Sequence, residues 1–334
     1  MATKKTGAKK TGKSKKKSSF TPANRFLRYQ LTGSATAGAE KSRFIDVAKD
    51  LAAINRRLYR QGKVYQIANI SVTTRDTING LISFSTAPDT WVTRGAWRRG
   101  LQMYDAMQKQ VLDMPGSKSR KGRYNDFKVY LSADHRTADI ERARDNGNNL
   151  AGTGEWVYSK FQTPDGSPSV DDFNAHLLGG HVGNAGTRES VGLILSYGEA
   201  RATVSNDLPN VDSQGSDDPL LNLFDAGTHI DEVANDLEND GDQAPYKITQ
   251  GGSQATVGEH YPGATSNLPK PMVNRIASMG SQGGISAPSI MLPGFTAIAG
   301  LIEVEMQSDI ASDVFDIVIE IAPGSYKGVA AFDI

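Results

Sequence analysis

The chain has 334 residues, enough for one large or two medium-sized domains with a substantial buried core. It contains no cysteine, which excludes disulfide-stabilised scaffolds and zinc sites with cysteine ligands. Its 37 basic and 37 acidic side chains balance, and no apolar run approaches the roughly 20 residues that a membrane-spanning helix needs.

The charge is unevenly divided along the chain. Residues 1–39 carry ten basic side chains and no acidic one, whereas residues 40–334 carry 27 basic and 37 acidic side chains. Residues 1–18 have no large apolar side chain except Met1, so we expect a disordered arm. Each lysine that contacts a phosphate releases a condensed counterion, so we expect the arm to bind nucleic acid. The predicted nucleic-acid-binding residues are Lys4, Lys5, Lys9, Lys10, Lys13, Lys15, Lys16, Lys17, Arg25 and Arg28.

The arm is not typical of a secretory signal peptide, because it lacks an apolar segment. The lysines of residues 13–17 also suit a nuclear-import signal. Residues 19–39 add aromatic and aliphatic side chains, which indicates a tether that docks on the body and ends in a small-residue hinge. The sequence therefore predicts an arm and tether over residues 1–39, and a shell domain with long loop insertions over residues 40–334.

The first half of the body mixes helices and strands. Apolar side chains at three- and four-residue spacing predict helices over residues 43–60 and 94–114. Between them, residues 64–74 and 81–86 are rich in β-branched side chains, which predicts two strands. The dipeptide Asn79-Gly80 is typical of a hairpin turn between them.

Strands separated by polar loops dominate the rest of the chain. The predicted strands cover residues 127–131, 156–161, 191–197, 200–205, 302–306, 315–321 and 328–334. The pattern of residues 219–237 predicts a third sizeable helix. The strands over 302–306 and 315–321 alternate apolar and acidic side chains, which suggests that they pair antiparallel. The whole pattern predicts a mainly β chain, an antiparallel sandwich with helices before it and in its loops.

No motif for chemistry survives inspection. Residues 7–14 match a phosphate-binding loop, but they lack the preceding core strand and the following helix that this loop needs. Residues 207–242 hold eleven acidic side chains and no basic one, yet Lys247 stands where a calcium loop needs glutamate. A looser calcium site there, and a solvated acidic surface, are both open. His176 and His181 do not have the spacing of a helical metal pair. We therefore predict no enzyme, no catalytic or metal-ligating residue and no cofactor.

A second basic cluster raises another binding hypothesis. It comprises Lys118, Arg120, Lys121 and Arg123 in a predicted loop, and Arg98 and Arg99 lie beside Trp97 on a predicted helix. Either group could extend a phosphate-binding surface, with Trp97 stacking on a base. Alternatively, the loop is solvated and Trp97 belongs to the core.

The basic arm, the β-dense remainder and the closing run over residues 300–329 resemble the jelly-roll capsid proteins of small icosahedral viruses. The resemblance is greatest to those of circular single-stranded DNA (CRESS-type) viruses. It implies an eight-stranded jelly roll, an inward-pointing arm, self-assembly into a homo-oligomeric icosahedral shell, and packaging of the single-stranded DNA genome. The expected location is the virion, with the host nucleus during assembly, and no membrane partner. The arm departs from the family in using lysine where arginine is frequent.

Two other functions are open. The first is a cellular nucleic-acid-binding protein whose basic tail grips DNA or RNA while its β-rich domain binds a partner. The second is a metal-dependent hydrolase that uses the acidic residues between 217 and 242. Closed particles of the purified protein would favour the capsid function, whereas a soluble monomer or small oligomer would favour the cellular nucleic-acid-binding protein. Loss of enzymatic turnover, without an effect on assembly, when these acidic residues are changed to alanine would favour the hydrolase.

Overall fold

The computed structural model describes the chain in eight stretches: residues 22–74, 79–113, 126–138, 140–163, 171–183, 188–197, 271–280 and 289–334. Several sequence predictions fall outside these residues. They concern the eight arm lysines, the basic loop 118–123, the strand 200–205, the acidic segment 207–242 and the helix 219–237.

Two antiparallel sheets of four main strands form the body. The first sheet has the order β1 (Phe26–Thr32), β13 (Val314–Ile321), β3 (Lys63–Thr74) and β10 (Ser289–Pro293). Two short strands, β11 (Thr296–Ile298) and β16 (Ala331–Asp333), also pair with β3. The second sheet has the order β2 (Glu40–Asp46), β12 (Leu301–Ser308), β4 (Asn79–Thr86) and β9 (Met272–Gly280).

Main strands that follow one another along the chain lie in different sheets, except for β4 and β9, which pair with each other. This holds for β1 and β2, β3 and β4, β9 and β10, and β12 and β13. The prediction that residues 302–306 and 315–321 pair is therefore wrong, because β12 pairs with β2 and β4 while β13 pairs with β1 and β3. The hairpin turn at Asn79-Gly80 is also wrong, because both residues begin β4.

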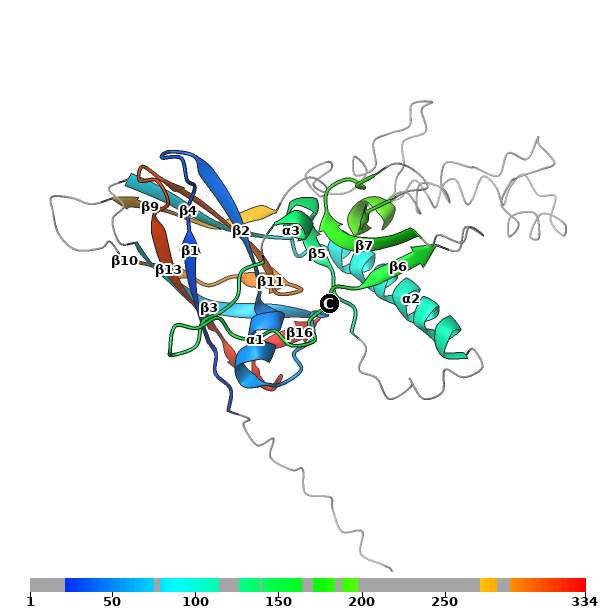
Figure 1. Cartoon of the computed structure of the whole chain (residues 1–334). Helices are drawn as coiled ribbons and strands as arrows, with labels where there is room; N and C mark the ends of the chain where they lie inside the picture. Colours follow the sequence, from blue (N-terminus) through cyan, green and yellow to red (C-terminus); the bar gives the residue numbers. More distant parts are fainter. Residues whose placement is uncertain are drawn as a thin grey trace, which may run out of the picture.

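The two sheets face each other (Figure 1) and share one hydrophobic core. Alternate residues of β12 and β13 are buried, so the predicted alternation is confirmed even though the predicted pairing is not. The mainly β, antiparallel character of the body is likewise confirmed. The core draws on every main strand, and its members include Leu27, Ile45, Val72, Phe84, Met279, Leu292, Val304 and Ile317.

The tether prediction needs correction for residues 26–32. They form β1, an integral strand of the first sheet, which pairs with β13 along its whole length. Its inward side chains Leu27, Tyr29 and Leu31 are completely buried. The sandwich therefore begins well before residue 40.

The predicted helix over residues 43–60 is a strand followed by a shorter helix, α1 (Val47–Asn55). Asp46 ends β2 and caps α1, because its side chain accepts a hydrogen bond of 3.0 Å from the Lys49 amide. Arg56 closes the helix in the left-handed region, with φ of 51°. Pairing of residues 40–46 with β12 overrides the helical periodicity there, and it leaves Leu58 half exposed.

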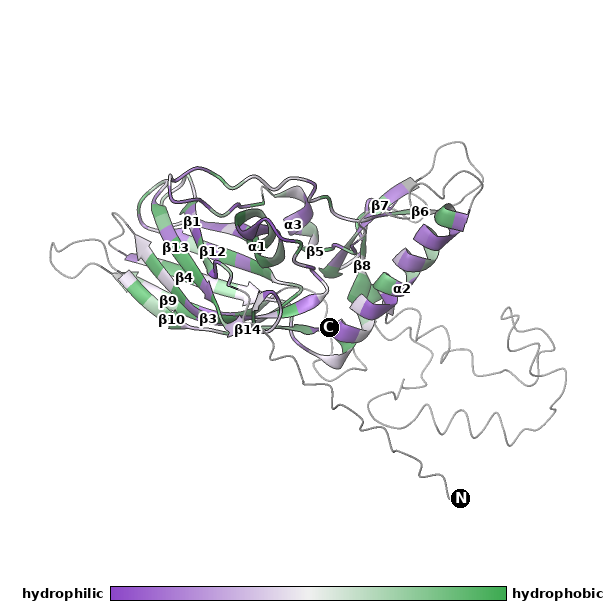
Figure 2. Cartoon of the chain, turned by 90° about the horizontal axis from the view of Figure 1, so that it is seen from below, coloured by the Kyte–Doolittle hydropathy of each residue, from purple (hydrophilic) through white to green (hydrophobic). Residues whose placement is uncertain are grey.

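A second module lies beside the sandwich (Figure 1). Its long helix α2 (Trp91–Asp113) confirms the helix predicted over 94–114, and Figure 2 shows hydrophobic and hydrophilic bands alternating along it. A small sheet joins β5 (Tyr130–Ser132), β7 (Asp171–Leu178), β6 (Lys160–Thr163) and β8 (Ser190–Gly192), and the short helix α3 (Ala133–Thr137) follows β5. A separate hydrophobic cluster, which includes Trp97, Tyr104, Phe127, Phe161 and Leu177, packs this module.

Three strand predictions in this module are right in place but wrong in extent. Of residues 127–131, only the last two are strand, and the pairing begins at Tyr130. Residues 156–159 are irregular before β6 begins at Lys160. Residues 190–192 form β8, but residues 193–197 are helical. Similarly, the final strand predicted over 328–334 is divided into β15 (Gly328–Val329), which pairs with β14 (Pro323–Gly324), and β16.

Residues 140–151 form an edge strap across one side of the sandwich. The Arg144 amide donates to the Arg28 carbonyl of β1 at 2.8 Å, and the Glu141 amide donates to the Phe44 carbonyl of β2 at 3.0 Å. The strap thus forms hydrogen bonds with the edge strand of each sheet. An edge strand without such partners can pair with another chain and cause aggregation.

Candidate functional site

The sequence-predicted binding residues fall into two groups. The eight arm lysines lie outside the described residues. Arg25 is partly buried, and its guanidinium contacts Glu320 at 3.4 Å and donates to the Ile321 carbonyl at 3.1 Å. Arg28 is exposed on β1. Arg25 therefore secures the start of β1 against β13, whereas Arg28 presents its charge to solvent.

Trp97 belongs to the core, so the base-stacking hypothesis is wrong. Its side chain is only 6% exposed, and its ring lies 5.7 Å from the ring of Phe127. Its neighbours bond within the chain: Arg98 Nε donates to the Ile334 carbonyl at 2.9 Å, and Arg99 donates to the Ser196 carbonyl at 2.8 Å. The three residues serve packing in the second module.

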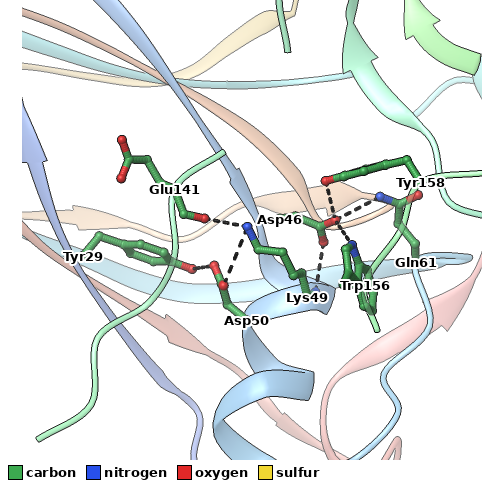
Figure 3. A network of polar contacts seen from close by, with 8 residues as sticks. All are labelled: Tyr29, Asp46, Lys49, Asp50, Gln61, Glu141, Trp156 and Tyr158. Atoms are coloured by element: carbon green, nitrogen blue, oxygen red, sulfur yellow. Dashed lines mark hydrogen bonds and ion pairs between the residues drawn. The ribbon is translucent and has the colours of Figure 1, made fainter. Parts of the chain in front are cut away.

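The most connected polar site was not predicted from the sequence (Figure 3). Its centre is Asp46, which is completely buried where β2 meets α1. One carboxylate oxygen accepts from Gln61 Nε2 at 3.1 Å, from Trp156 Nε1 at 3.2 Å and from the Tyr158 hydroxyl at 3.0 Å. The other oxygen caps α1. Asp46 therefore joins the sandwich to the loop that leads into β6.

Asp50 lies one helical turn further on and is also completely buried. It accepts a hydrogen bond of 2.7 Å from the Tyr29 hydroxyl, and Lys49 Nζ lies 3.9 Å from its other oxygen. The same Nζ donates to the Glu141 carbonyl at 2.6 Å. This half of the network joins β1, α1 and the edge strap.

Burial controls the electrostatics of both carboxyl groups. Desolvation raises the pKa of Asp46 above its usual value, and it raises the pKa of Asp50 from 3.8 to about 6. The attraction of Lys49 and the hydrogen bonds lower both pKa values, but by less than burial raises them. Carboxyl groups with raised pKa values are typical of acid–base catalytic sites. Whether this pair could be catalytic therefore depends on whether a substrate can reach it.

Access argues against catalysis at this network. A surface pocket of about 460 Å³ is lined by Arg60, Lys63, Trp97, Tyr104, Asp333 and seven further residues, with neither Asp46 nor Asp50 among them. Both carboxyl groups are fully covered by protein. A substrate would have no route to them, so the network is structural.

A buried serine–histidine pair fails the same test. His176 Nδ1 lies 2.6 Å from Ser190 Oγ, and its Nε2 lies 2.9 Å from the Gly180 carbonyl. Both His176 and Ser190 are completely buried. Burial lowers the pKa of His176 to about 4, so the ring is neutral at pH 7 and holds β7 against β8.

His135 is the second buried histidine. Its Nδ1 accepts a hydrogen bond of 3.0 Å from the Leu131 amide, and its ring stacks on Phe44 with centroids 4.8 Å apart. Burial lowers its pKa to about 3, with a smaller contribution from the charge of Lys49. It connects the second module to β2 as a neutral ring.

Comparisons with known proteins give no match: no family model, no curated protein and no solved structure is similar to this chain. Within the stretches that the structure describes, no group of three or more metal-ligating side chains is assembled. Over the same stretches, no helix is both long and apolar enough to cross a membrane.

Proposed function

We propose that this chain is a viral capsid protein whose sandwich is a jelly roll, and whose lysine arm packages a single-stranded DNA genome. The observation that carries the proposal is the strand order. The two sheets, β1–β13–β3–β10 and β2–β12–β4–β9, are antiparallel, and successive main strands alternate between them except for β4 and β9, which pair with each other. Eight strands arranged in this way fit a double Greek key, an architecture that capsid and lectin domains use.

The position of the arm supports packaging. The lysine-rich segment is joined to the start of β1, at one edge of the first sheet. Lysine contacts a phosphate as a point charge, so the arm would neutralise a genome without reading its sequence. A shell of sixty symmetric copies would bring on the order of 600 positive charges inside. The net negative body would compete little for that genome.

The insertion between β4 and β9 supports a role in assembly. It contains the edge strap, α2 and the small sheet, and it packs beside the sandwich around a hydrophobic cluster that also includes Phe44, Val64 and Leu301 of the sandwich. The strap already bonds to one edge strand of each sheet, so these edges are not open to strands of another copy. Contacts between copies would therefore use side-chain surfaces. We therefore place homo-oligomeric contacts on this module and on the sandwich faces.

Electron microscopy of the purified full-length protein tests the proposal, together with the 260/280 nm absorbance ratio after nuclease treatment. We expect closed, uniform particles that protect nucleic acid. A variant with all eight arm lysines changed to glutamine keeps the arm length, so it should retain the fold and lose the protected nucleic acid. A monomer at every salt concentration and pH would contradict the capsid and favour the cellular nucleic-acid-binding protein.

A further inference from the structure

Cationic side chains gather on the body where the described chain begins. Arg57 and Arg60 are exposed in the turn that follows α1, while Lys63 and Lys327 are partly exposed beside them. We call Arg57, Arg60, Lys63 and Lys327, with the rings of Tyr59 and Tyr326, the basic cluster. It is a local exception to the net negative charge of residues 40–334.

The two tyrosine rings hold the cluster together. Lys63 Nζ lies 4.7 Å and Lys327 Nζ lies 5.5 Å from the centre of the Tyr326 ring, so both ammonium groups face the same ring. Lys327 Nζ is also 5.8 Å from the Tyr59 ring. The Arg60 amide donates to the Tyr326 hydroxyl at 3.0 Å, and the Tyr59 hydroxyl donates to the Lys327 carbonyl at 2.9 Å.

The positive charges of the cluster repel one another. The pKa of Lys327 is lowered, chiefly by burial and then by repulsion from Arg60, Arg57 and Lys63, which Asp126 partly offsets. Lys327 also has a backbone φ of 52°, a conformation that costs energy in a non-glycine residue. The protein thus maintains both charge repulsion and backbone strain at this place.

Acidic side chains attract both lysines of the cluster. Lys63 forms an ion pair with Asp333, and Asp126 attracts Lys327. Asp126 and Asp333 both line the surface pocket described above, and Arg60 and Lys63 line it too. Because acids line that pocket, the part of the cluster outside it, around Arg57 and Lys327, suits an anion better than the pocket does.

We propose that the basic cluster binds phosphate groups of the nucleic acid held by the arm, an inference that rests on the proposed packaging function. The Arg57 guanidinium donates to the Pro22 carbonyl at 2.8 Å, which fixes the first described residue against the cluster. Lys17 is five residues before Pro22, so it can lie at most about 18 Å away along an extended chain. A strand bound to the last arm lysines is therefore within reach of the cluster.

Nucleic acid fits this site for two reasons. Its phosphates repeat along a flexible strand, so one strand can contact the arm and the cluster together. Arginine can also bond a phosphate with two parallel N–H groups, and Arg57 and Arg60 are exposed enough to do so. The main competitor is an acidic surface of another copy of the chain, which would also be attracted to the cluster.

Binding of a single-stranded oligothymidine to the full-length protein, measured at several salt concentrations, tests the inference. The variant is Arg57→Gln with Arg60→Gln, and the control is Lys109→Gln with Arg142→Gln, two exposed cations on α2 and the edge strap. Losing two phosphate contacts should make the log–log salt slope shallower by about 1.4 and weaken binding roughly 25-fold at 0.1 M salt. The control should bind like the wild type, and circular dichroism checks that each variant is folded.

Four outcomes separate the cluster from the arm. If the wild type binds with a steep slope and the cluster variant binds identically, the cluster inference is overturned and the packaging function stands. If the eight-lysine variant of the arm keeps the full slope and the cluster variant loses it, the cluster stands and the arm fails. A flat wild-type slope overturns both. If the cluster variant changes only the oligomeric state, the cluster is a contact between copies and the nucleic-acid assignment falls.

Discussion

The hydroxyl of Tyr29 on β1 donates a hydrogen bond of 2.7 Å to Asp50 on α1, and both residues are completely buried. β1 belongs to the first sheet, whereas α1 directly follows β2 of the second sheet. The bond therefore joins the beginnings of the two sheets. Asp50 relies on this donor and on Lys49 to offset part of its desolvation.

Substitution Tyr29→Phe should destabilise the fold by about 1–3 kcal/mol, because a buried carboxylate loses a donor without gaining water. Equilibrium unfolding in urea, followed by circular dichroism, measures the loss. Tyr130→Phe is a matched control, since Tyr130 is partly exposed and its ring stacks on Tyr158 at 4.0 Å. A loss of equal size in both variants would contradict a special role for the Tyr29 hydroxyl.

The raised pKa of Asp50 predicts a pH dependence of stability. Its pKa is about 6 in the folded protein and close to 3.8 in the unfolded chain, so the folded state binds the proton more tightly. Stability from this group therefore increases as pH falls from about 6 to about 4. The difference in urea midpoint between the wild type and Asp50→Asn, measured at each pH, should shift in favour of the wild type over this range. A difference that is constant with pH would disprove the raised pKa.

The buried histidines act in the opposite direction. Burial lowers the pKa of His135 to about 3 and that of His176 to about 4, below the usual value of 6.5. The stability that these neutral rings contribute is therefore complete above pH 6.5 and is lost as pH falls towards 4 and 3. We expect the ring-proton NMR signals of both residues to stay unshifted from pH 8 to pH 5. A titration midpoint near 6.5 for either ring would show that it is solvated.

Gly294 lies where the chain passes between β10 and β11, and it has no room for a side chain. A Cβ atom there would lie 1.9 Å from the Ile67 carbonyl oxygen and 2.5 Å from that of Ala68, both on β3. Gly294→Ala should therefore cost about 3 kcal/mol or more, because a backbone strand must move. Gly152→Ala is the control, since a Cβ atom at Gly152 would meet nothing within 4 Å. Thermal unfolding of the two variants gives the comparison.

Local patterns predicted four of the eight main strands, β3, β4, β12 and β13, and did not predict β1, β2, β9 and β10. Residues 302–306 and 315–321 alternate because one face of each strand packs on the core, and this alternation is visible in the sequence. Residues 64–74 and 81–86 were recognisable instead by their β-branched side chains. Which strands pair was not predictable in the same way. β12 and β13 follow each other in the sequence, so their pattern predicted that they pair. Instead, each pairs with strands that are far away in the sequence. A local pattern carries no information about such distant partners.

The polar network shows a second limit of local patterns. Asp46, Lys49 and Asp50 at the start of a helix look like solvated charges, since acids are favourable near helix N-termini. Only the tertiary structure brings Tyr29, Gln61 and Trp156 to them. The basic cluster was missed for a similar reason. Its arginines and Lys63 follow α1, whereas Lys327 and Tyr326 come from the turn before β15.

Neighbouring strands in both main sheets come from opposite ends of the chain. β12 and β13 are each flanked by two partners in their sheets, and both are synthesised after the other main strands. A ribosome-bound chain that lacks residues 301–334 therefore cannot complete either sheet. Such long-range pairing slows folding and leaves β1 and β2 without strand partners until β12 and β13 are synthesised, so their edges can join those of other chains. The lysine arm, by contrast, is synthesised before the body, so under the proposed function it would be free to engage a polyanion before the body has folded.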